Sequence, residues 1–328
     1  MAVKRRKPSR ARRVFLGALW GFWTLAFLGI GTTLGWLSTS EQLAPGKILS
    51  LVKTMRTDPK EVFHEDAMNI LVLGCDEDLY YGGKTVLKHA ARSDMMLVAR
   101  LDFARKRITG ISIPRDTRCD LPGYGIRKIN AYHAIATYAE GPDLARRAVE
   151  HLLSDEVKID RVVVIDYEAF MKFVDLIGGV EVSTPIPLKY TDRAGGLYID
   201  IPKGTSRQDG YGAMGYVRIR KHAGDDYMRQ DRQKQLLVAI KTQVSQQWTQ
   251  IPRYVDAGVK VLGNTFDFNE ITALAAFAGR VPKKDIVLGQ LPTRPGRGSF
   301  LLIDERKARR AVAEAGLTGE DPATVAKR

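Results

Sequence analysis

Arginine and aspartate recur together in short clusters along the middle of this chain, and these residues have the clearest chemical potential. The planar guanidinium group binds phosphate bidentately and stays charged at ordinary pH, so several converging arginines would form a strong polyanion site. Taken singly, each cluster reads equally well as a solvated surface ion pair of a basic protein. The clusters are Arg92-Ser93-Asp94, Pro114-Arg115-Asp116, Arg218-Ile219-Arg220 and Arg229-Gln230-Asp231-Arg232-Gln233.

Two aspartates could hold a divalent cation against a bound phosphate. Asp76 follows an apolar run that ends at Gly74, and Asp94 lies at the start of the next run. Mg²⁺ is usually bound by one or two carboxylates together with substrate phosphates, which this pair would supply. The metal would neutralise phosphate oxygens as a phosphoryl bond breaks, while arginines stabilise the charge on the leaving group.

Residues two apart in an extended segment present their side chains on one face. This spacing predicts that Arg92 and Asp94 share a face, and that Arg218 and Arg220 do so as well. Two arginines on one face, joined by Arg229 from the helix that follows, would make a clamp for a diphosphate.

A helix predicted over residues 227–248 places polar side chains on its apolar stripe. The stripe includes Leu237, and stepping back by four residues reaches Gln233 and then Arg229. An arginine on the protein surface would not need to lie in line with the apolar stripe of its helix. We therefore expect both polar side chains to line a pocket.

The elements that must position these residues are predicted from apolar runs. Runs at 69–74, 95–101 and 108–113 predict buried strands of one sheet. Asp76 follows the first strand, and the cluster at 114–116 follows the third. Parallel or suitably ordered strands would bring these ends to one edge, where ligands bind in open α/β sheets.

Strands and helices then alternate along the chain, which predicts a layered α/β domain with helices over a central sheet. Six glycines and three prolines in 184–215 predict a hairpin and irregular loops. The other predicted strands are 161–165 and 180–183, and the other predicted helices are 142–153, 167–177, 269–278 and 305–315.

The charge distribution predicts a membrane anchor. The net charge is +14, and seven positive charges lie within residues 1–13 before any acidic residue. Residues 14–37 carry no charge and are long enough to cross a bilayer as a helix. The positive-inside rule places residues 1–13 in the cytoplasm and the chain after Leu37 outside. A cleaved signal peptide is the alternative, but its apolar core is roughly 7 to 15 residues long, so we expect a retained anchor.

Cys75 and Cys119 fall in the exported part, where a disulfide is possible. Two cysteines 44 residues apart form no metal or redox motif, so we expect them to be packing residues. The chain contains no GxSxG elbow, P-loop or HExxH pair. Phosphoryl transfer depends mainly on positioning and electrostatics, so the lack of a nucleophile motif does not exclude it.

Seven segments, in order, resemble the LytR-CpsA-Psr family of bacterial membrane-anchored enzymes of cell-wall assembly. They cover 69–244 and read NILVLGCD, RSDMMLVARLD, ISIPRDT, KINAYHA, VVVIDYEAFMKFVDLIGGVEV, YVRIRK and DDYMRQDRQKQ. The sequence departs from the family's pattern at Cys75, where serine is common, and at Met95, where threonine is common.

The resemblance implies transfer of a glycan 1-phosphate from a polyprenyl-diphosphate carrier to a peptidoglycan hydroxyl, with Mg²⁺ as cofactor. By position in the motifs, the metal ligands are Asp76 and Asp94. Asp226 is implied to orient an arginine or move a proton, and Arg92 and Arg115 are counted with it as catalytic. The implied diphosphate ligands are Arg92, Arg115, Lys128, Arg218, Arg220, Arg229 and Gln233.

The resemblance also implies a three-layer α-β-α sandwich with a central mixed sheet, preceded by one transmembrane helix, and an apolar tunnel for the prenyl chain. The expected organisation is a basic cytoplasmic tip (1–13), a transmembrane helix (14–37), an extracytoplasmic connector (38–66), the catalytic domain (67–250) and a C-terminal helical extension (251–328).

Three other functions remain open. Water could replace the peptidoglycan hydroxyl, which would make the protein a polyprenyl-diphosphate pyrophosphatase. A non-catalytic scaffold, or a membrane-anchored regulatory or binding protein, could use the same fold. The basic tip is too short to read nucleic acid and is explained by topology and anionic lipid, so the bilayer is its expected partner.

Overall fold

The computed structural model describes residues 58–75, 92–135, 140–192, 197–219, 225–246 and 265–319, with a few positions between 250 and 258. All of them belong to one compact unit that begins at Thr54. The predicted transmembrane helix, residues 14–37, lies outside this part of the chain. None of the helices in the described part is long and apolar enough to cross a membrane.

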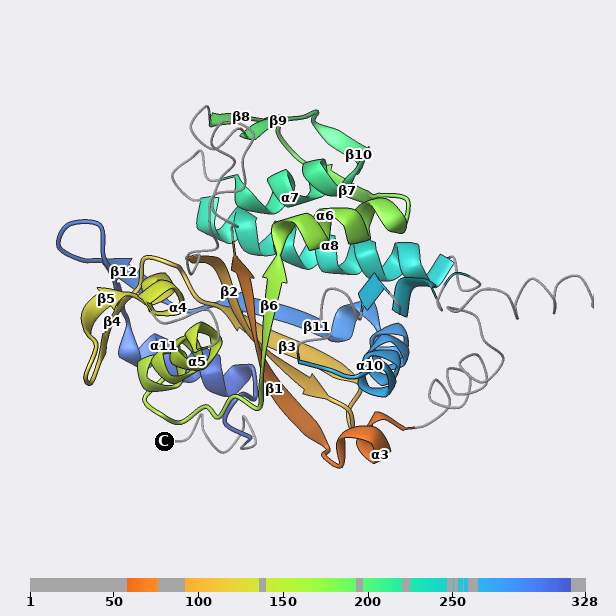
Figure 1. Cartoon of the computed structure of the whole chain (residues 1–328). Helices are drawn as coiled ribbons and strands as arrows, with labels where there is room; N and C mark the ends of the chain where they lie inside the picture. The colour runs from red at the N-terminus through yellow and green to blue at the C-terminus, as the bar shows by residue number, and fades with distance from the viewer. Residues whose placement is uncertain are drawn as a thin grey trace, which may run out of the picture. The chain divides into compact units, whose positions relative to one another are not determined.

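A mixed five-stranded sheet organises the unit, with helices and smaller hairpins around it (Figure 1). Its spatial order is β11-β3-β2-β1-β6. The strands are β1 (Ala67–Cys75), β2 (Ser93–Asp102), β3 (Arg107–Ser112), β6 (Arg161–Asp166) and β11 (Ile286–Gln290). The predicted mixed α/β architecture is therefore confirmed.

Four of the five strands run in the same direction. β1 is parallel to β6 and β3 is parallel to β11, while β2 runs antiparallel to both of its neighbours. The carboxyl ends of β1, β3, β6 and β11 therefore meet the start of β2 at one edge of the sheet. The ends of the first and third predicted strands, which precede Asp76 and the 114–116 cluster in the chain, therefore lie at one edge, as predicted.

One face of the sheet carries the larger hydrophobic core. Leu71, Val98 and Ile111 alternate onto this face and are almost completely buried. Helices α5 (Gly141–Leu152) and α11 (Glu305–Glu314) pack against them through Ala148 and Val312. Burial of these side chains, each worth about 1.5 to 3 kcal/mol, fixes the register of the strands that reach the polar edge.

The opposite face is unevenly covered. Away from the polar edge, Leu101 and Ile108 are buried, and the neighbouring Phe103 packs edge-to-face on Phe277 of α10 (Phe268–Arg280). Towards the polar edge, apolar side chains on the same face are only half-buried. They are Val72, Met95, Leu97, Ile165 and Leu288.

A second core lies beyond β6 and is built from helices and two hairpins. Its elements are α6 (Tyr167–Leu176), β7 (Val180–Thr184), β8 (Leu188–Asp192), β9 (Leu197–Ile201), β10 (Gly204–Gln208), α7 (Gly210–Arg218) and α8 (Asp225–Gln246). β7 pairs with β10 and β8 pairs with β9, both antiparallel. Figure 1 shows α6, α7 and α8 beside the sheet, with the hairpins beyond them.

Helix α7 corrects the prediction of irregular loops up to residue 215. The side chain of Asp209 caps the helix by accepting from the N–H of Gly212. The glycines serve close packing rather than turns. A Cβ on Gly210 would lie 2.2 Å from the carbonyl oxygen of Met171 in α6, and a Cβ on Gly215 would lie 2.5 Å from Ile199.

The C-terminal region is more than the helical extension expected for 251–328, because β11 completes the central sheet beside β3. Local apolar content did not reveal this five-residue strand, whose pairing partner lies about 180 residues away in sequence. The region also contains the short helix η4 (Lys283–Asp285) and the hairpin of β12 (Thr293–Pro295) and β13 (Leu301–Ile303).

The remaining elements are short and lie near the two edges of the sheet. They are α3 (Pro59–Phe63), β4 (Arg118–Leu121), β5 (Gly125–Lys128), η2 (Ile129–Ala131) and α4 (Tyr132–Ile135). The predicted strands 69–74, 95–101, 108–113, 161–165 and 180–183 and the predicted helices are confirmed within a few residues at each end.

Candidate functional site

A tight turn follows β3 and presents two charged side chains at the carboxyl edge of the sheet. The N–H and the hydroxyl of Thr117 both donate to the carbonyl of Pro114, at 3.0 and 2.6 Å. This closes a four-residue turn whose central residues are Arg115 and Asp116. Thr117 is fully buried, so it holds the end of the turn in the protein interior, while the charged side chains of the turn remain partly exposed.

A β-bulge places Asp94 beside this turn. Gly74 of β1 pairs with Met95, but the next residue, Cys75, pairs with Ser93, so Asp94 is the extra residue between these pairs. Such a bulge interrupts the alternation of side chains and re-aims the extra one. The regular two-residue spacing predicted for Arg92 and Asp94 is corrected accordingly.

The charged groups form a chain of alternating sign along the edge. Nη1 of Arg115 lies 2.7 Å from Oδ2 of Asp94, and its Nε lies 3.8 Å from Oδ2 of Asp116. Nζ of Lys128 lies 2.8 Å from Oδ1 of Asp116. We call these four residues, Asp94, Arg115, Asp116 and Lys128, the charged edge. Each of their side chains keeps roughly a quarter to a third of its surface exposed.

Backbone hydrogen bonds hold Lys128 in this position. It ends the β4–β5 hairpin, and the next residue, Ile129, donates its N–H to the carbonyl of Thr117 at 2.8 Å. Asn130 donates its N–H to the carbonyl of Arg115 at 3.3 Å. These bonds join the backbone of the hairpin to that of the turn, so Arg115 and Lys128 lie next to each other at this edge.

The environment of Arg115 keeps it charged. Partial burial acts to lower its pKa, but the ion pair with Asp94 and the nearby Asp116 outweigh burial, so the net pKa lies above its usual value. Two carboxylates thus neutralise two cations while no anion is bound. A phosphate arriving here would exchange partners with carboxylates instead of meeting bare cations.

The structure describes only some of the other predicted ligands. Arg92 directly precedes β2 at the same edge and is exposed, and Gln233 is half-buried on α8. Asp76 and Arg220 lie outside the described residues. The backbones of Arg218, Asp226 and Arg229 are described but their side chains are not.

The extended geometry predicted for the 218–220 segment is wrong at its first residue. Arg218 ends helix α7, and the chain becomes extended only at Ile219. Arg232 on α8 is 5% exposed, and its Nη2 donates to the carbonyl of Ile219 at 2.9 Å. This contact fastens the segment that carries the two predicted arginines to α8.

The predicted metal ligands are only partly described. Within the described residues, no group of three or more His, Cys, Asp or Glu side chains is placed to hold a metal ion. Asp94 contributes one carboxylate, and Asp76 lies outside this part of the chain. The magnesium site therefore stays a prediction.

Two features of this edge were not predicted from the sequence. Asp116 bridges both cations, whereas the sequence showed it only as a neighbour of Arg115. Tyr167 begins α6 directly after β6, and its ring lies 3.4 Å from the position that a Cβ on Gly74 would occupy. The rule that ligands bind at the carboxyl ends of parallel strands could have identified Tyr167, because it is the first residue after such an end.

The cysteines do not form a disulfide. Both thiols are buried and neither is oxidised to a disulfide, which confirms the expectation that they are packing residues. The Cys75 sulfur lies 3.7 Å from Nδ1 of the buried His133, and the Cys119 thiol donates to the carbonyl of Ala148. Burial raises the pKa of Cys119 to about 11, so this thiol is protonated at neutral pH.

Residues 46–309 match the LytR_cpsA_psr family. Among curated proteins, the chain is 30% identical over 183 residues to the regulatory protein MsrR of Staphylococcus aureus, covering 56% of this chain and 51% of MsrR. It is 33% identical over 209 residues to the polyisoprenyl-teichoic acid–peptidoglycan teichoic acid transferase TagT of Bacillus subtilis, covering 62% of this chain and 61% of TagT. The chain therefore spans about half to three fifths of the length of these relatives.

Solved structures share the fold. The crystal structure of B. subtilis TagV has a TM-score of 0.60 and 25% identity, covering 77% of this chain and 97% of TagV. TagT with bound octaprenyl pyrophosphate lipid has a TM-score of 0.53 and 23% identity, covering 80% of this chain and 92% of TagT. The central mixed sheet is thus common to this chain and to these proteins.

Proposed function

We propose, from the premise that this chain belongs to the LytR-CpsA-Psr family, that it is a phosphotransferase of cell-wall assembly. It would move a glycopolymer 1-phosphate from a polyprenyl-diphosphate carrier to a peptidoglycan hydroxyl. The acceptor oxygen forms a bond to the glycan-bearing phosphorus, the phosphoanhydride bond breaks, and polyprenyl phosphate leaves.

The charged edge is the observation that carries this proposal. It lies where the carboxyl ends of β1 and β3 meet the start of β2, and it brings two cations to the same carboxylate, that of Asp116. Two neighbouring cations suit a diphosphate, whose two phosphates each carry negative charge. In the proposal Arg92, Arg218, Arg220, Arg229 and Gln233 complete the diphosphate site.

The partly covered face of the sheet suits the lipid part of the donor. Val72, Met95, Leu97 and Leu288 are apolar, half-buried and directed to the face that ends at the charged edge. A prenyl chain laid on this face would bury apolar surface that the protein leaves partly exposed. The diphosphate at its head would then lie beside Arg115.

Mg²⁺ fits the oxygen donors at this edge. The Asp94 carboxylate is accessible and already lies beside a cation, and Asp76 follows β1 in the chain at the same end of the sheet. We propose that these two residues hold the ion, which would neutralise phosphate oxygens during transfer. Arg115 and Lys128 would bind the diphosphate, and Asp226 would orient an arginine or accept the proton of the acceptor hydroxyl.

The proposal extends to the location and architecture of the whole protein. Residues 14–37 would form a single transmembrane helix with the N-terminus in the cytoplasm and the catalytic domain outside the cell. The three-layer α-β-α arrangement with a central mixed sheet belongs to the same proposal.

The name of MsrR supports a second candidate, a regulatory protein that binds the same lipid-linked glycan without transferring it. Hydrolysis by water is the third candidate. One experiment separates all three. The full chain in detergent is incubated with a synthetic polyprenyl-diphosphate glycan, with and without peptidoglycan oligomers, and with Mg²⁺ or excess chelator.

A glycan linked to peptidoglycan through phosphate, formed only with Mg²⁺, is the expected product. Release of glycan phosphate at an equal rate with and without acceptor would instead identify a pyrophosphatase. Intact donor in every reaction, together with measurable donor binding, would identify a binding or regulatory protein.

A further inference from the structure

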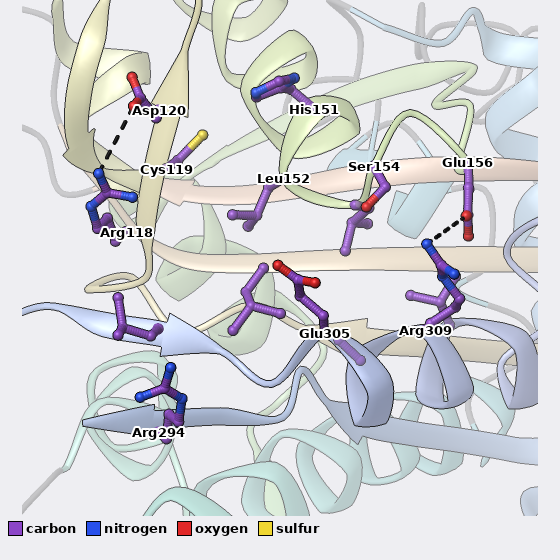
Figure 2. Close-up of a pocket in the computed structure, with 15 residues that line it drawn as sticks. Arg118, Cys119, Asp120, His151, Leu152, Ser154, Glu156, Arg294, Glu305 and Arg309 are labelled. Atoms are coloured by element: carbon purple, nitrogen blue, oxygen red, sulfur yellow. Dashed lines mark ion pairs between the residues drawn. The ribbon is translucent and has the colours of Figure 1, made fainter. Parts of the chain in front are cut away.

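A cavity of about 400 Å³ lies beside the charged edge and has no part in the function proposed above (Figure 2). It is enclosed by β4, the end of α5 and the loop after it, the β12–β13 hairpin and the start of α11. Its volume falls in the range of small-molecule sites and is large enough for one or two sugar rings.

The polar lining is balanced in charge. Arg118 lies 3.8 Å from Asp120, and Arg309 lies 3.4 Å from Glu156. These two ion pairs frame opposite ends of the cavity in Figure 2.

Two further charged side chains are available to a ligand. Arg294 on β12 and Glu305 at the start of α11 both line the cavity. Among the described residues, neither forms an ion pair or a side-chain hydrogen bond. Figure 2 shows both directed to the space between the two framing pairs. Arg294 supplies several N–H donors, and Glu305 supplies two acceptor oxygens.

The rest of the wall is apolar. Leu152, Leu302 and Ile303 are half-buried, and Val312 is buried beneath them. A pyranose ring has one apolar face of C–H groups and a rim of hydroxyls that both donate and accept. An apolar wall with a balanced rim of donors and acceptors matches this pattern better than it matches a lipid or a phosphate.

The rim of the cavity is held in an uncommon backbone conformation. Ser154 and Asp155, in the loop after α5, both have positive φ, at 61° and 59°. Non-glycine residues adopt this region at a cost, and such residues are found frequently near functional sites. Their N–H groups are bonded to the carbonyls of His151 and Glu150, which keeps this wall fixed.

The cavity and the charged edge share the β4–β5 hairpin. Arg118 of the cavity is paired across the β4–β5 hairpin with Lys128 of the edge. The N–H of Leu301, next to the cavity residue Leu302, donates to the carbonyl of Asp116 at 2.9 Å. A sugar in the cavity would therefore lie one strand away from the phosphate-binding side chains.

We propose that this cavity is a saccharide-binding subsite that places a sugar of a glycan substrate next to the phosphate site. The proposal rests on the function proposed above and adds the place where the glycan is held. Arg294 and Glu305 hydrogen-bond the sugar hydroxyls or an N-acetyl group, and Leu302 and Ile303 contact the apolar face of the ring.

Direct binding tests the subsite without requiring turnover. The probe is N,N′,N″-triacetylchitotriose, titrated into the full chain in detergent and followed by isothermal calorimetry. The double variant Arg294→Ala/Glu305→Gln is expected to bind at least tenfold more weakly than the wild type. The matched control is Arg297→Ala/Glu314→Gln, which changes the same residue types on the same hairpin and helix outside the cavity, and it should bind as the wild type does.

Transfer kinetics identify which glycan occupies the subsite. In the double variant, a rise in KM for the peptidoglycan acceptor with unchanged KM for the lipid donor assigns the subsite to the acceptor. A rise for the donor alone assigns it to the transferred glycan. Either result supports the proposal, and hydrolysis of the donor by water should continue in the acceptor case.

Two results would overturn the proposal. One is the absence of triacetylchitotriose binding to the wild type, and the other is equal binding to the wild type and the double variant. If the wild type performs no transfer at all, the proposed function fails, but the calorimetric comparison still decides whether the cavity binds sugar.

Discussion

At the scale of single residues, a β-bulge and a tight turn determine where the charged side chains lie. Asp94 owes its position to the bulge against Cys75, and Arg115 owes its position to the turn closed by Thr117. The bulge and the turn are each a few residues long, and buried backbone holds both in place. The charged side chains can therefore be replaced without removing the structure that positions them.

Replacing Asp94 by asparagine keeps the shape of this residue and removes its charge. In the proposed metal site, this loses one of two carboxylates, so the Mg²⁺ concentration that gives half-maximal transfer should rise about tenfold or more. A magnesium titration of transfer activity measures this shift. Asp102→Asn is the control, because Asp102 ends the same strand but pairs with Arg105 at the opposite edge. Equal titration curves for both variants would exclude Asp94 as a ligand.

Cys119 gives a prediction for stability in alkali. Burial raises its pKa to about 11 in the folded protein, whereas an unfolded thiol ionises near about 8.5. The stability that comes from burying this thiol in its protonated form is therefore fully present below about pH 8.5 and is lost as the pH rises to about 11, by roughly 3 kcal/mol. Urea unfolding at several pH values should show a steeper loss for the wild type than for Cys119→Ala. Parallel pH profiles would contradict the assignment.

At the scale of helices and strands, periodicity predicted most of the elements but not their partners. The runs at 69–74 and 108–113 gave β1 and β3, because buried strands are continuous apolar segments. The same patterns did not reveal β11, which is recognised as part of the sheet only through its pairing with β3. The arrangement of Arg115 beside Asp94 depends on this non-local order of strands.

Helix α7 was not predicted from the sequence, because glycine occurs both in turns and in helices that pack closely against their neighbours. A cluster of glycines in sequence predicts turns, but Gly210 and Gly215 lie in a helix where neighbouring elements leave no room for a side chain. Only tertiary contacts distinguish these cases. The extended geometry for Arg218 was predicted from its two-residue spacing to Arg220, but Arg218 ends α7 instead.

Gly210→Ala tests this reading of α7. The added Cβ would lie 2.2 Å from a backbone carbonyl of α6, so we expect the free energy of unfolding to fall by about 1 to 3 kcal/mol. Gly279→Ala in α10 is the control, because its position is exposed and a Cβ there meets nothing within 4 Å. That substitution should raise the free energy of unfolding by roughly 0.5 to 1 kcal/mol. Denaturant unfolding measures both, and a neutral Gly210→Ala would contradict the close approach.

At the scale of the whole folded unit, the charged edge lies where two hydrophobic cores meet. Arg115 lies in the turn after β3 of the central sheet, which carries one core, and Tyr167 at the start of α6 packs against the second core. Binding sites commonly form at such junctions, because each core can hold one part of a ligand. In the proposal, the sheet holds the diphosphate and its prenyl chain, and α8 adds Arg229 and Gln233.

Seven of the fourteen net positive charges lie within residues 1–13, so the rest of the chain carries +7, an excess that fits the lipid-linked polyanion of the proposal. The sequence showed this charge and the arginine clusters, but it did not show how the cations are compensated. The structure adds that Asp94 and Asp116 neutralise the two cations of the charged edge. A bound diphosphate must displace or share these contacts.

The most direct measurement of the central claim compares two arginine variants of the full chain in glycan transfer. Arg115→Ala removes the central cation of the charged edge, and Arg105→Ala removes an exposed arginine paired with Asp102 at the opposite edge. We expect kcat/KM for transfer to fall about 100-fold or more for Arg115→Ala, as for loss of a donor that stabilises a transition state. Arg105→Ala should stay within about twofold of the wild type, since exposed ion pairs contribute little. Similar activities for Arg115→Ala and Arg105→Ala, with both variants folded, would contradict the claim that the charged edge binds the diphosphate.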